Sequence, residues 1–251
     1  MERIFKYSPP QGFIDWYKNR VPRPTIWDHL PSSDPQVIEE GIFYYSKERL
    51  RAELYKEQYA ICCYCNKSIQ NDHTSIIEHF LPRSVYELET FNYNNLLLSC
   101  DGNYKKETDK KYHCDKLKQD KVLKLNPSNI LYLKDLIYDE FGGIYSNTNE
   151  GIEAIKVLGL DCNSLVNRRK IIIGDIVFDN FNSYSKSSKY RKIFFKIINR
   201  PIEFKYQIIN IMLNKMNIID KSMCLIIHGF HYKIRRYRNL IRIIRNYLFN
   251  N

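Results

Sequence analysis

The feature that most constrains this chain is a group of five cysteines between positions 62 and 114, out of seven in all 251 residues. Cys62 and Cys65 form a C-x2-C pair, and a tight turn at that spacing brings two sulfurs to the same side of one Zn²⁺ ion. Cys63 lies between them and is expected to point away. Cys100 and Cys114 can complete a tetrahedral site if the loop between them closes back. We therefore predict a structural zinc site at these two pairs; a set of unrelated buried thiols is the alternative.

The cysteines are predicted to bind metal rather than form disulfides because we expect a cytoplasmic protein. No apolar run approaches the roughly 20 residues that a membrane span needs, and the N-terminal MERIFKYSPP lacks the apolar core of a signal peptide. Disulfides rarely persist in the cytoplasm, so clustered cysteines there favour a metal site. Cys162 and Cys224 stand alone and are predicted to be small buried apolar residues.

The charge balance indicates a polyanionic partner, because the formal net charge is +11 at pH 7. A basic surface without such a partner is the alternative. The region from Lys221 to Asn251 holds seven Lys and Arg and no acid. Its helical spacing predicts a stripe that contacts phosphates, made of Arg235, Arg238, Arg242 and Arg245. A membrane-surface helix or a contact with a partner protein stays open as an alternative for this stripe.

Local patterns along the chain predict a mixture of helices and short strands. Residues 1–40 are interrupted by prolines and carry short helical pieces such as FIDWYKNR. Residues 45–60 have helical spacing without Gly or Pro. Residues 128–146 suggest a small hairpin with the glycine pair GG in its turn. From residue 151 onward the pattern is mostly helical, although the β-branched run IIIGDIVF is also compatible with a strand.

Three further motifs accompany the first cysteine pair. In EHFLP (78–82) a carboxylate, Glu78, directly precedes His79 at the end of a β-branched run, and a proline follows. NLLLSC (95–100) leads into the third cysteine, and HCDKLK (113–118) surrounds the fourth. An adjacent acid and histidine suit phosphodiester hydrolysis, in which a base activates water and a hard divalent cation neutralises charge on the phosphate.

The four motifs in this order resemble the HNH, or ββα-metal, endonucleases, and most of all the HNH proteins found with retrons and Septu-type anti-phage systems. The flanks LRAELYKEQYAICCYC and AIKVLGLDCNSLVNRRK resemble theirs as well. The chain departs from the family in its long insert between Cys100 and Cys114, and in Asp115, where many relatives have Asn or His.

The resemblance implies an α+β fold, with a small ββα-metal core and a structural zinc knuckle embedded in a mainly helical shell. The segments that it implies are 1–60 for an N-terminal proline-rich wrap and helix, 61–125 for the HNH core with the zinc site, and 126–251 for a mainly helical, basic C-terminal region.

The resemblance also implies roles for individual residues. His79 is the expected general base, Glu78 a ligand of Mg²⁺ or another divalent cation, and Asn95 the residue that holds the histidine loop by hydrogen bonds. Asp115 is expected to complete the metal site, with His113 as a rival ligand. Asp115 can equally serve as the N-cap of the helix after Cys114.

Lys116 and Lys118 follow at once and are predicted to contact nucleic acid beside the site. The expected function is therefore metal-dependent endonuclease cleavage of DNA or RNA. The resemblance further implies anti-phage defence together with an ABC-type ATPase partner, or a complex of retron reverse transcriptase and its msDNA. Two alternatives remain open: a zinc-finger nucleic-acid-binding module without cleavage activity, and an RNase toxin that acts on a structured RNA such as transfer RNA.

Overall fold

The computed structural model describes most of the N-terminal two thirds of the chain. The described residues are 4–34, 44–103, 112–129, 136–139 and 141–173. By internal contacts the chain divides into two compact units, Met1–Ile172 and Ile173–Asn251. The predicted arginine stripe at Arg235, Arg238, Arg242 and Arg245 and the lone Cys224 lie outside the described residues.

The N-terminal segment forms one α-helix and one short 3₁₀ helix, as its proline-interrupted pattern predicts. Helix α1 (Gln11–Asn19) begins after Pro10 and buries Phe13 and Trp16, while η1 (Trp27–His29) buries its own tryptophan. Both tryptophan rings pack on Phe91. The aromatic residues of this segment therefore pack around Phe91.

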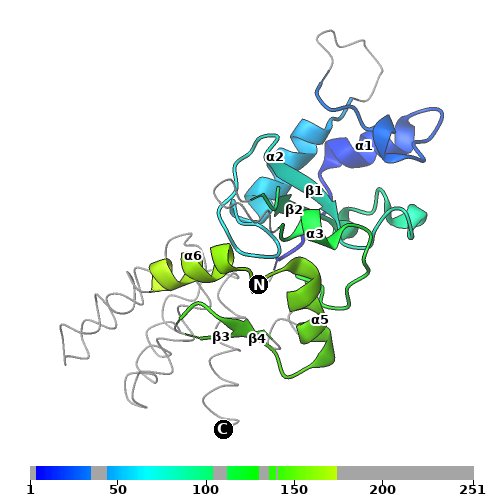
Figure 1. Cartoon of the computed structure of the whole chain (residues 1–251). Helices are drawn as coiled ribbons and strands as arrows, with labels where there is room; N and C mark the ends of the chain where they lie inside the picture. Colours follow the sequence, from blue (N-terminus) through cyan, green and yellow to red (C-terminus); the bar gives the residue numbers. More distant parts are fainter. Residues whose placement is uncertain (1–3, 35–43, 104–111, 130–135, 140, 174–251) are drawn as a thin grey trace, which may run out of the picture. The chain divides into compact units, whose positions relative to one another are not determined.

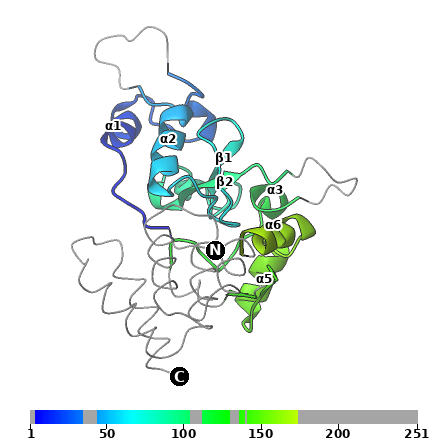
Figure 2. The same ribbon diagram turned by 90° about the vertical axis from the view of Figure 1, so that its left-hand side faces the viewer.

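Helix α2 (Lys47–Glu57) confirms the helix predicted over residues 45–60. The Ser46 hydroxyl caps it by accepting a hydrogen bond from the Arg49 N–H at 3.3 Å. Leu50 and Leu54 are fully buried on one face, and α2 packs against the strands β1 (Ser75–His79) and β2 (Leu96–Cys100) (Figure 2).

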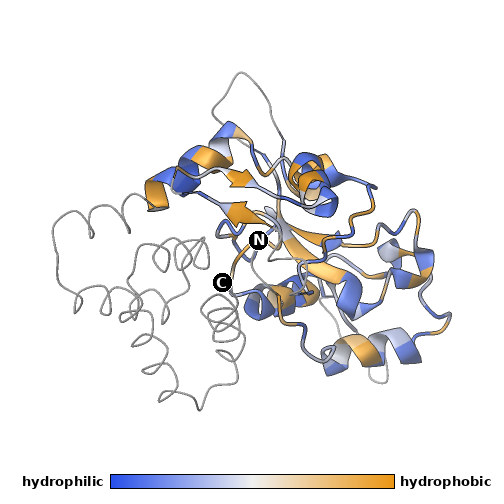
Figure 3. Ribbon diagram, turned by 90° about the horizontal axis from the view of Figure 1, so that it is seen from below, coloured by the Kyte–Doolittle hydropathy of each residue, from blue (hydrophilic) through white to orange (hydrophobic). Residues whose placement is uncertain are grey.

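The first sheet pairs β1 (Ser75–His79) with β2 (Leu96–Cys100) in antiparallel register, with His79 opposite Leu96 and Ser75 opposite Cys100. All five residues of β2 are buried. In Figure 3 the strands are mostly orange, the colour of hydrophobic residues. The 3₁₀ turns η2 (Glu87–Glu89) and η3 (Tyr93–Asn95) lie in the connection. A short helix, α3 (Asp115–Lys118), comes next, so strand, strand and helix follow in chain order (Figure 1).

The remaining elements are a small hairpin and two helices. Strands β3 (Ile137–Tyr138) and β4 (Ile144–Tyr145) pair around a turn that contains the glycine pair, as predicted. Gly142 has φ +87°, and a Cβ there would meet the Val166 carbonyl oxygen at 2.3 Å, so a side chain does not fit.

Two helices follow this hairpin, α5 (Asn149–Leu158) and α6 (Asn163–Ile173). They confirm the helical pattern predicted after residue 151, and α6 includes the first three residues of IIIGDIVF. The described residues thus form a mixed α+β structure with five α-helices and two small antiparallel sheets. None of the helices in these ranges has the length and apolar character needed to cross a membrane.

Candidate metal centre and adjoining carboxylate site

The four predicted zinc ligands lie together in the interior. Their sulfur atoms are all within 4.8 Å of one another, and every one of these cysteines is buried. Cys62 Sγ lies 3.8 Å from Cys114 Sγ, and Cys65 Sγ lies 3.8 Å from Cys100 Sγ. A tetrahedral Zn²⁺ with Zn–S bonds of about 2.3 Å requires sulfurs about 3.8 Å apart. The predicted grouping of the four cysteines is therefore confirmed, and the cluster fits a structural zinc ion.

The first pair is shaped by a tight turn of the backbone. The Cys62 N–H donates to the Lys67 carbonyl at 2.9 Å, and the Asn66 N–H donates to the Cys62 carbonyl at 3.2 Å. Asn66 adopts φ +60°, a left-handed conformation that asparagine tolerates better than most residues. The Cys63 N–H donates to the Leu98 carbonyl at 3.0 Å, which fixes the turn against β2.

The second pair is brought together by the end of β2 and the start of α3. Cys100 is the last residue of β2, and Cys114 is the N-cap of α3 with φ +55°. Gly102 has φ +65°, and a Cβ there would meet the His113 carbonyl oxygen at 2.0 Å. The Cys114 N–H also donates to the Leu158 carbonyl at 2.8 Å, so the end of α5 supports the fourth ligand.

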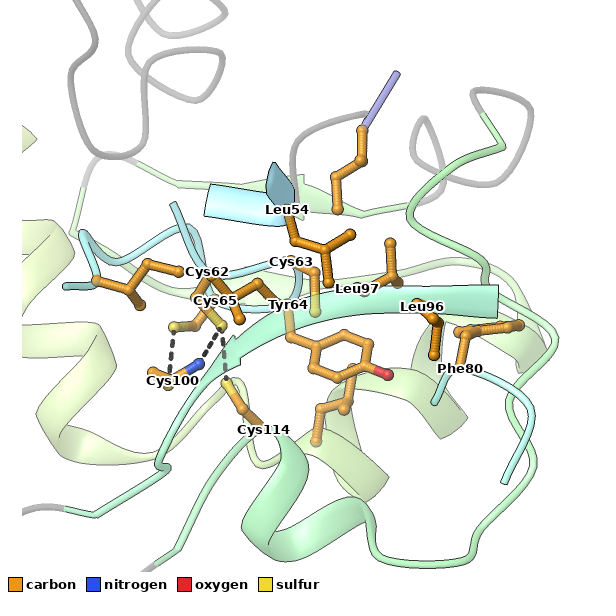
Figure 4. Close-up of a cluster of buried hydrophobic side chains, with 14 of the residues drawn as sticks. Leu54, Cys62, Cys63, Tyr64, Cys65, Phe80, Leu96, Leu97, Cys100 and Cys114 are labelled. Atoms are coloured by element: carbon orange, nitrogen blue, oxygen red, sulfur yellow. Dashed lines mark hydrogen bonds between the residues drawn. The ribbon is translucent and has the colours of Figure 1, made fainter. Parts of the chain in front are cut away.

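The thiols of the CCYC turn at residues 62–65, called the zinc knuckle here, differ in their pKa values. Burial alone raises the pKa of the Cys62 thiol, but hydrogen bonds from Cys100, Cys114 and the neighbouring thiols outweigh it and hold that pKa well below its ordinary value. Burial raises the pKa of the Cys63 thiol well above its ordinary value. Figure 4 shows the Cys63 sulfur directed away from the other four, as predicted. Cys63 is therefore a neutral buried thiol.

His113 lies against the sulfur cluster. Its Nδ1 is 3.1 Å from Cys114 Sγ and 3.8 Å from Cys100 Sγ, and the residue is buried. An imidazole N–H at this place can donate to a zinc-bound thiolate, which is a common outer contact of such ligands. Within the described residues its side chain contacts the zinc cysteines, and its rival role as a ligand of the divalent-cation site stays a prediction.

Glu78 lies in a buried polar cluster on the other side of the knuckle from the sulfurs. It is only 4% exposed, and its Oε1 accepts a hydrogen bond from the Tyr64 hydroxyl at 2.7 Å. The Lys118 ammonium forms an ion pair with the same oxygen at 2.7 Å and donates to the His79 carbonyl at 3.2 Å. Lys118 is 1% exposed, so the side chain predicted to contact nucleic acid is occupied inside the protein; the neighbouring Lys116 is exposed.

Two carboxyl groups meet at this cluster. Burial raises the pKa of the Glu78 carboxyl to about 8; a hydrogen bond with the Asp115 carboxyl adds to the rise, and the charge of Lys118 opposes it. Asp115 is the first residue of α3, and the N-cap is Cys114, so the alternative capping role of Asp115 is not observed. The carboxyl groups of Glu78 and Asp115 together offer hard oxygen donors of the kind that a divalent cation such as Mg²⁺ prefers.

His79 occupies a different environment from its neighbour, because successive residues on a strand face opposite sides. Its Nε2 lies 3.0 Å from the Thr90 carbonyl oxygen, and the Trp27 ring meets it edge-on with 4.6 Å between ring centroids. Since a carbonyl can only accept, Nε2 carries the hydrogen and Nδ1 keeps its lone pair. Burial lowers the pKa of His79 to about 4, only partly offset by the hydrogen bond to Thr90, so the ring is neutral at pH 7.

Asn95 holds the loop that follows His79. Its Oδ1 accepts from the Leu81 N–H at 2.7 Å, and its Nδ2 donates to the carbonyls of Leu81 at 3.0 Å and Glu89 at 3.1 Å. The side chain is 4% exposed. Asn95 thus makes three hydrogen bonds across this loop, whose far end supplies the Thr90 carbonyl to His79.

Sequence reasoning missed three residues of this neighbourhood: Tyr64, Trp27 and Thr90. The position of Tyr64 inside the C-x2-C pair was a usable signal, because the direction of a side chain between two zinc ligands is nearly fixed by the turn. Trp27 and Thr90 reach His79 through long-range packing, which no local pattern reports.

Comparison with protein-family models and with curated proteins found no match for this chain. The geometry described above therefore carries the functional argument.

Proposed function

We propose that this protein is a metal-dependent endonuclease of the HNH type, in which a structural zinc centre supports an adjoining hydrolytic site. The observation that carries the proposal is the pair at the end of β1. Glu78 is joined there to a second carboxyl group, and His79 beside it is a neutral imidazole whose tautomer is set by a backbone carbonyl.

His79 is the proposed general base. Because Nε2 donates to Thr90, the lone pair of Nδ1 is the one that can take a proton from water. The ring is already neutral at pH 7, so no proton has to leave before it acts. Contact with Trp27 limits rotation of the ring, which suits a base that must be held in one orientation.

Glu78 and Asp115 are the proposed ligands of a divalent cation, which when bound supplies positive charge to the phosphate oxygens and the leaving oxygen. The two carboxyl groups would hold and orient that cation. The Asn95 amide orients the loop after His79 and so maintains the position of the base.

The basic composition supports nucleic acid as the substrate. The net charge of +11 favours a polyphosphate over a neutral substrate. Lys116 is exposed one residue after Asp115 and is the proposed phosphate contact next to the site. From the resemblance of its motifs we also propose a role in anti-phage defence, with an ABC-type ATPase as partner.

Cleavage by the zinc-loaded protein tests this function. The protein is incubated with duplex DNA and, separately, with total RNA, in Mg²⁺ and with Mg²⁺ omitted. Cleavage of at least one substrate that depends on added Mg²⁺ is expected. Binding of both substrates without cleavage, with the ATPase partner also present, would reject the nuclease.

A zinc-supported nucleic-acid-binding module without cleavage is the second candidate. Two observations favour it: the Lys118 ammonium already occupies Glu78 Oε1 at 2.7 Å, and His79 is only 8% exposed. In that case the polar cluster serves stability alone, and substitution of Glu78 leaves nucleic-acid affinity unchanged.

A further inference from the structure

Tyr64 links the two centres of this molecule. It stands between Cys63 and Cys65 in the zinc knuckle, and it is fully buried. Figure 4 shows its ring extending away from the sulfur atoms, with the hydroxyl at the far end. That hydroxyl donates to Glu78 Oε1 at 2.7 Å. One short segment thus carries zinc ligands on one side and a hydrogen bond to the proposed metal carboxylate on the other.

Lys118, in the helix that follows Cys114, contacts the same oxygen of Glu78. It lies one helical turn after Cys114, and its ammonium is 2.7 Å from Glu78 Oε1. Each carboxylate oxygen has two lone pairs, so Tyr64 and Lys118 together satisfy Oε1. The carboxyl group of Asp115 also contacts Glu78, and a cation bound by both carboxyl groups would take the place of that contact. Tyr64 directly precedes the zinc ligand Cys65, and Lys118 lies in α3, whose N-cap is the zinc ligand Cys114. Zinc binding by these cysteines therefore determines the positions of both donors.

We propose that Tyr64 is a positioning residue through which the zinc centre orients the carboxylate of Glu78 for a divalent cation. This inference rests on the proposed function, because it presumes a cation at Glu78 and Asp115. Groups that hold a ligating carboxylate by hydrogen bonds typically contribute about 10–100-fold to metal affinity. Tyr64 therefore acts on the metal through Glu78 and needs no contact with the substrate.

The test measures Mn²⁺ affinity by electron paramagnetic resonance or calorimetry on the full-length, zinc-loaded chain. Tyr64→Phe removes only the hydroxyl. The matched control is Tyr45→Phe, since Tyr45 is also buried and its hydroxyl has no hydrogen-bond partner in the described part of the chain. Tyr64→Phe should keep its zinc, bind Mn²⁺ about 10–100-fold more weakly, and recover cleavage when Mn²⁺ is raised. Tyr45→Phe should match the wild type in all three measurements.

Each contrary result has a distinct meaning. Equal Mn²⁺ affinity in Tyr64→Phe and wild type would overturn the role of Tyr64 and leave the nuclease standing. Loss of zinc from Tyr64→Phe would also overturn it, because the hydroxyl would then serve the knuckle itself. If wild type and Glu78→Gln bind Mn²⁺ equally, the metal site of the proposed function fails, and the inference fails with it.

Discussion

Replacement of Asn95 by Ala should destabilise the described part of the chain by about 2–4 kcal/mol. The side chain makes three hydrogen bonds of 2.7–3.1 Å, and it is 4% exposed. A hydrogen bond contributes about 1 kcal/mol net, and a buried polar group left without a partner costs more. Leu81 is only half-buried, so water can replace part of its lost bonds, which places the cost within this range.

Urea unfolding followed by tryptophan fluorescence measures this cost. Both tryptophans of the chain, Trp16 and Trp27, pack on Phe91 in the segment that Asn95 supports, so their emission reports on that region. Asn94→Ala is the matched control, because Asn94 is exposed and its substitution should stay within about 0.5 kcal/mol of wild type. An Asn95→Ala protein as stable as this control would refute the reasoning, since the loop would then be held by other contacts.

Two further predictions concern the zinc centre and the histidine. Cys65→Ala should lose zinc and unfold the region, because structural zinc supplies about 10–16 kcal/mol of apparent binding energy. Cys63→Ala, the control, should retain one equivalent of zinc by elemental analysis. Equal zinc contents in the two variants would contradict the assignment of the ligands. The pKa of His79 is lowered from 6.5 to about 4 on folding, so its neutral form stabilises the fold above pH 6.5, and this contribution of up to about 3 kcal/mol is lost as the pH falls toward 4. His79→Ala should therefore lose less stability between pH 6.5 and 4 than wild type or the exposed-site control His73→Ala in urea titrations; parallel curves would contradict the burial argument.

The zinc cluster and the main helices could be predicted because their signals are local. The C-x2-C spacing fixes one pair of sulfurs, and helical spacing without Gly or Pro marks α2. The fate of Lys118 could not be predicted in this way. A lysine after the fourth cysteine resembles an exposed phosphate contact, and its burial depends on Glu78, which lies far earlier in the chain. His113 is a similar case: the sequence made it a rival ligand of the divalent-cation site, whereas in the structure its Nδ1 lies 3.1 Å from Cys114 Sγ and 3.8 Å from Cys100 Sγ.

Local sequence patterns also could not predict the different surroundings of Glu78 and His79 on β1. Adjacent residues on a strand face opposite sides, but what each side contains is decided by long-range packing. Glu78 meets Tyr64 from the knuckle, and His79 meets Trp27 from the N-terminal segment. The sequence motif thus located the pair, whereas the two environments became visible only in the folded chain.

The cleavage rate of the His79→Ala protein, loaded with zinc, tests the central proposal most directly. If His79 is the general base, the variant should keep one equivalent of zinc, bind nucleic acid with nearly wild-type affinity, and cut about 10²–10⁴-fold more slowly in Mg²⁺. His73→Ala, prepared in the same way, should cut at the wild-type rate. A folded, zinc-loaded His79→Ala protein that cuts at a near-normal rate would contradict the nuclease assignment of this site.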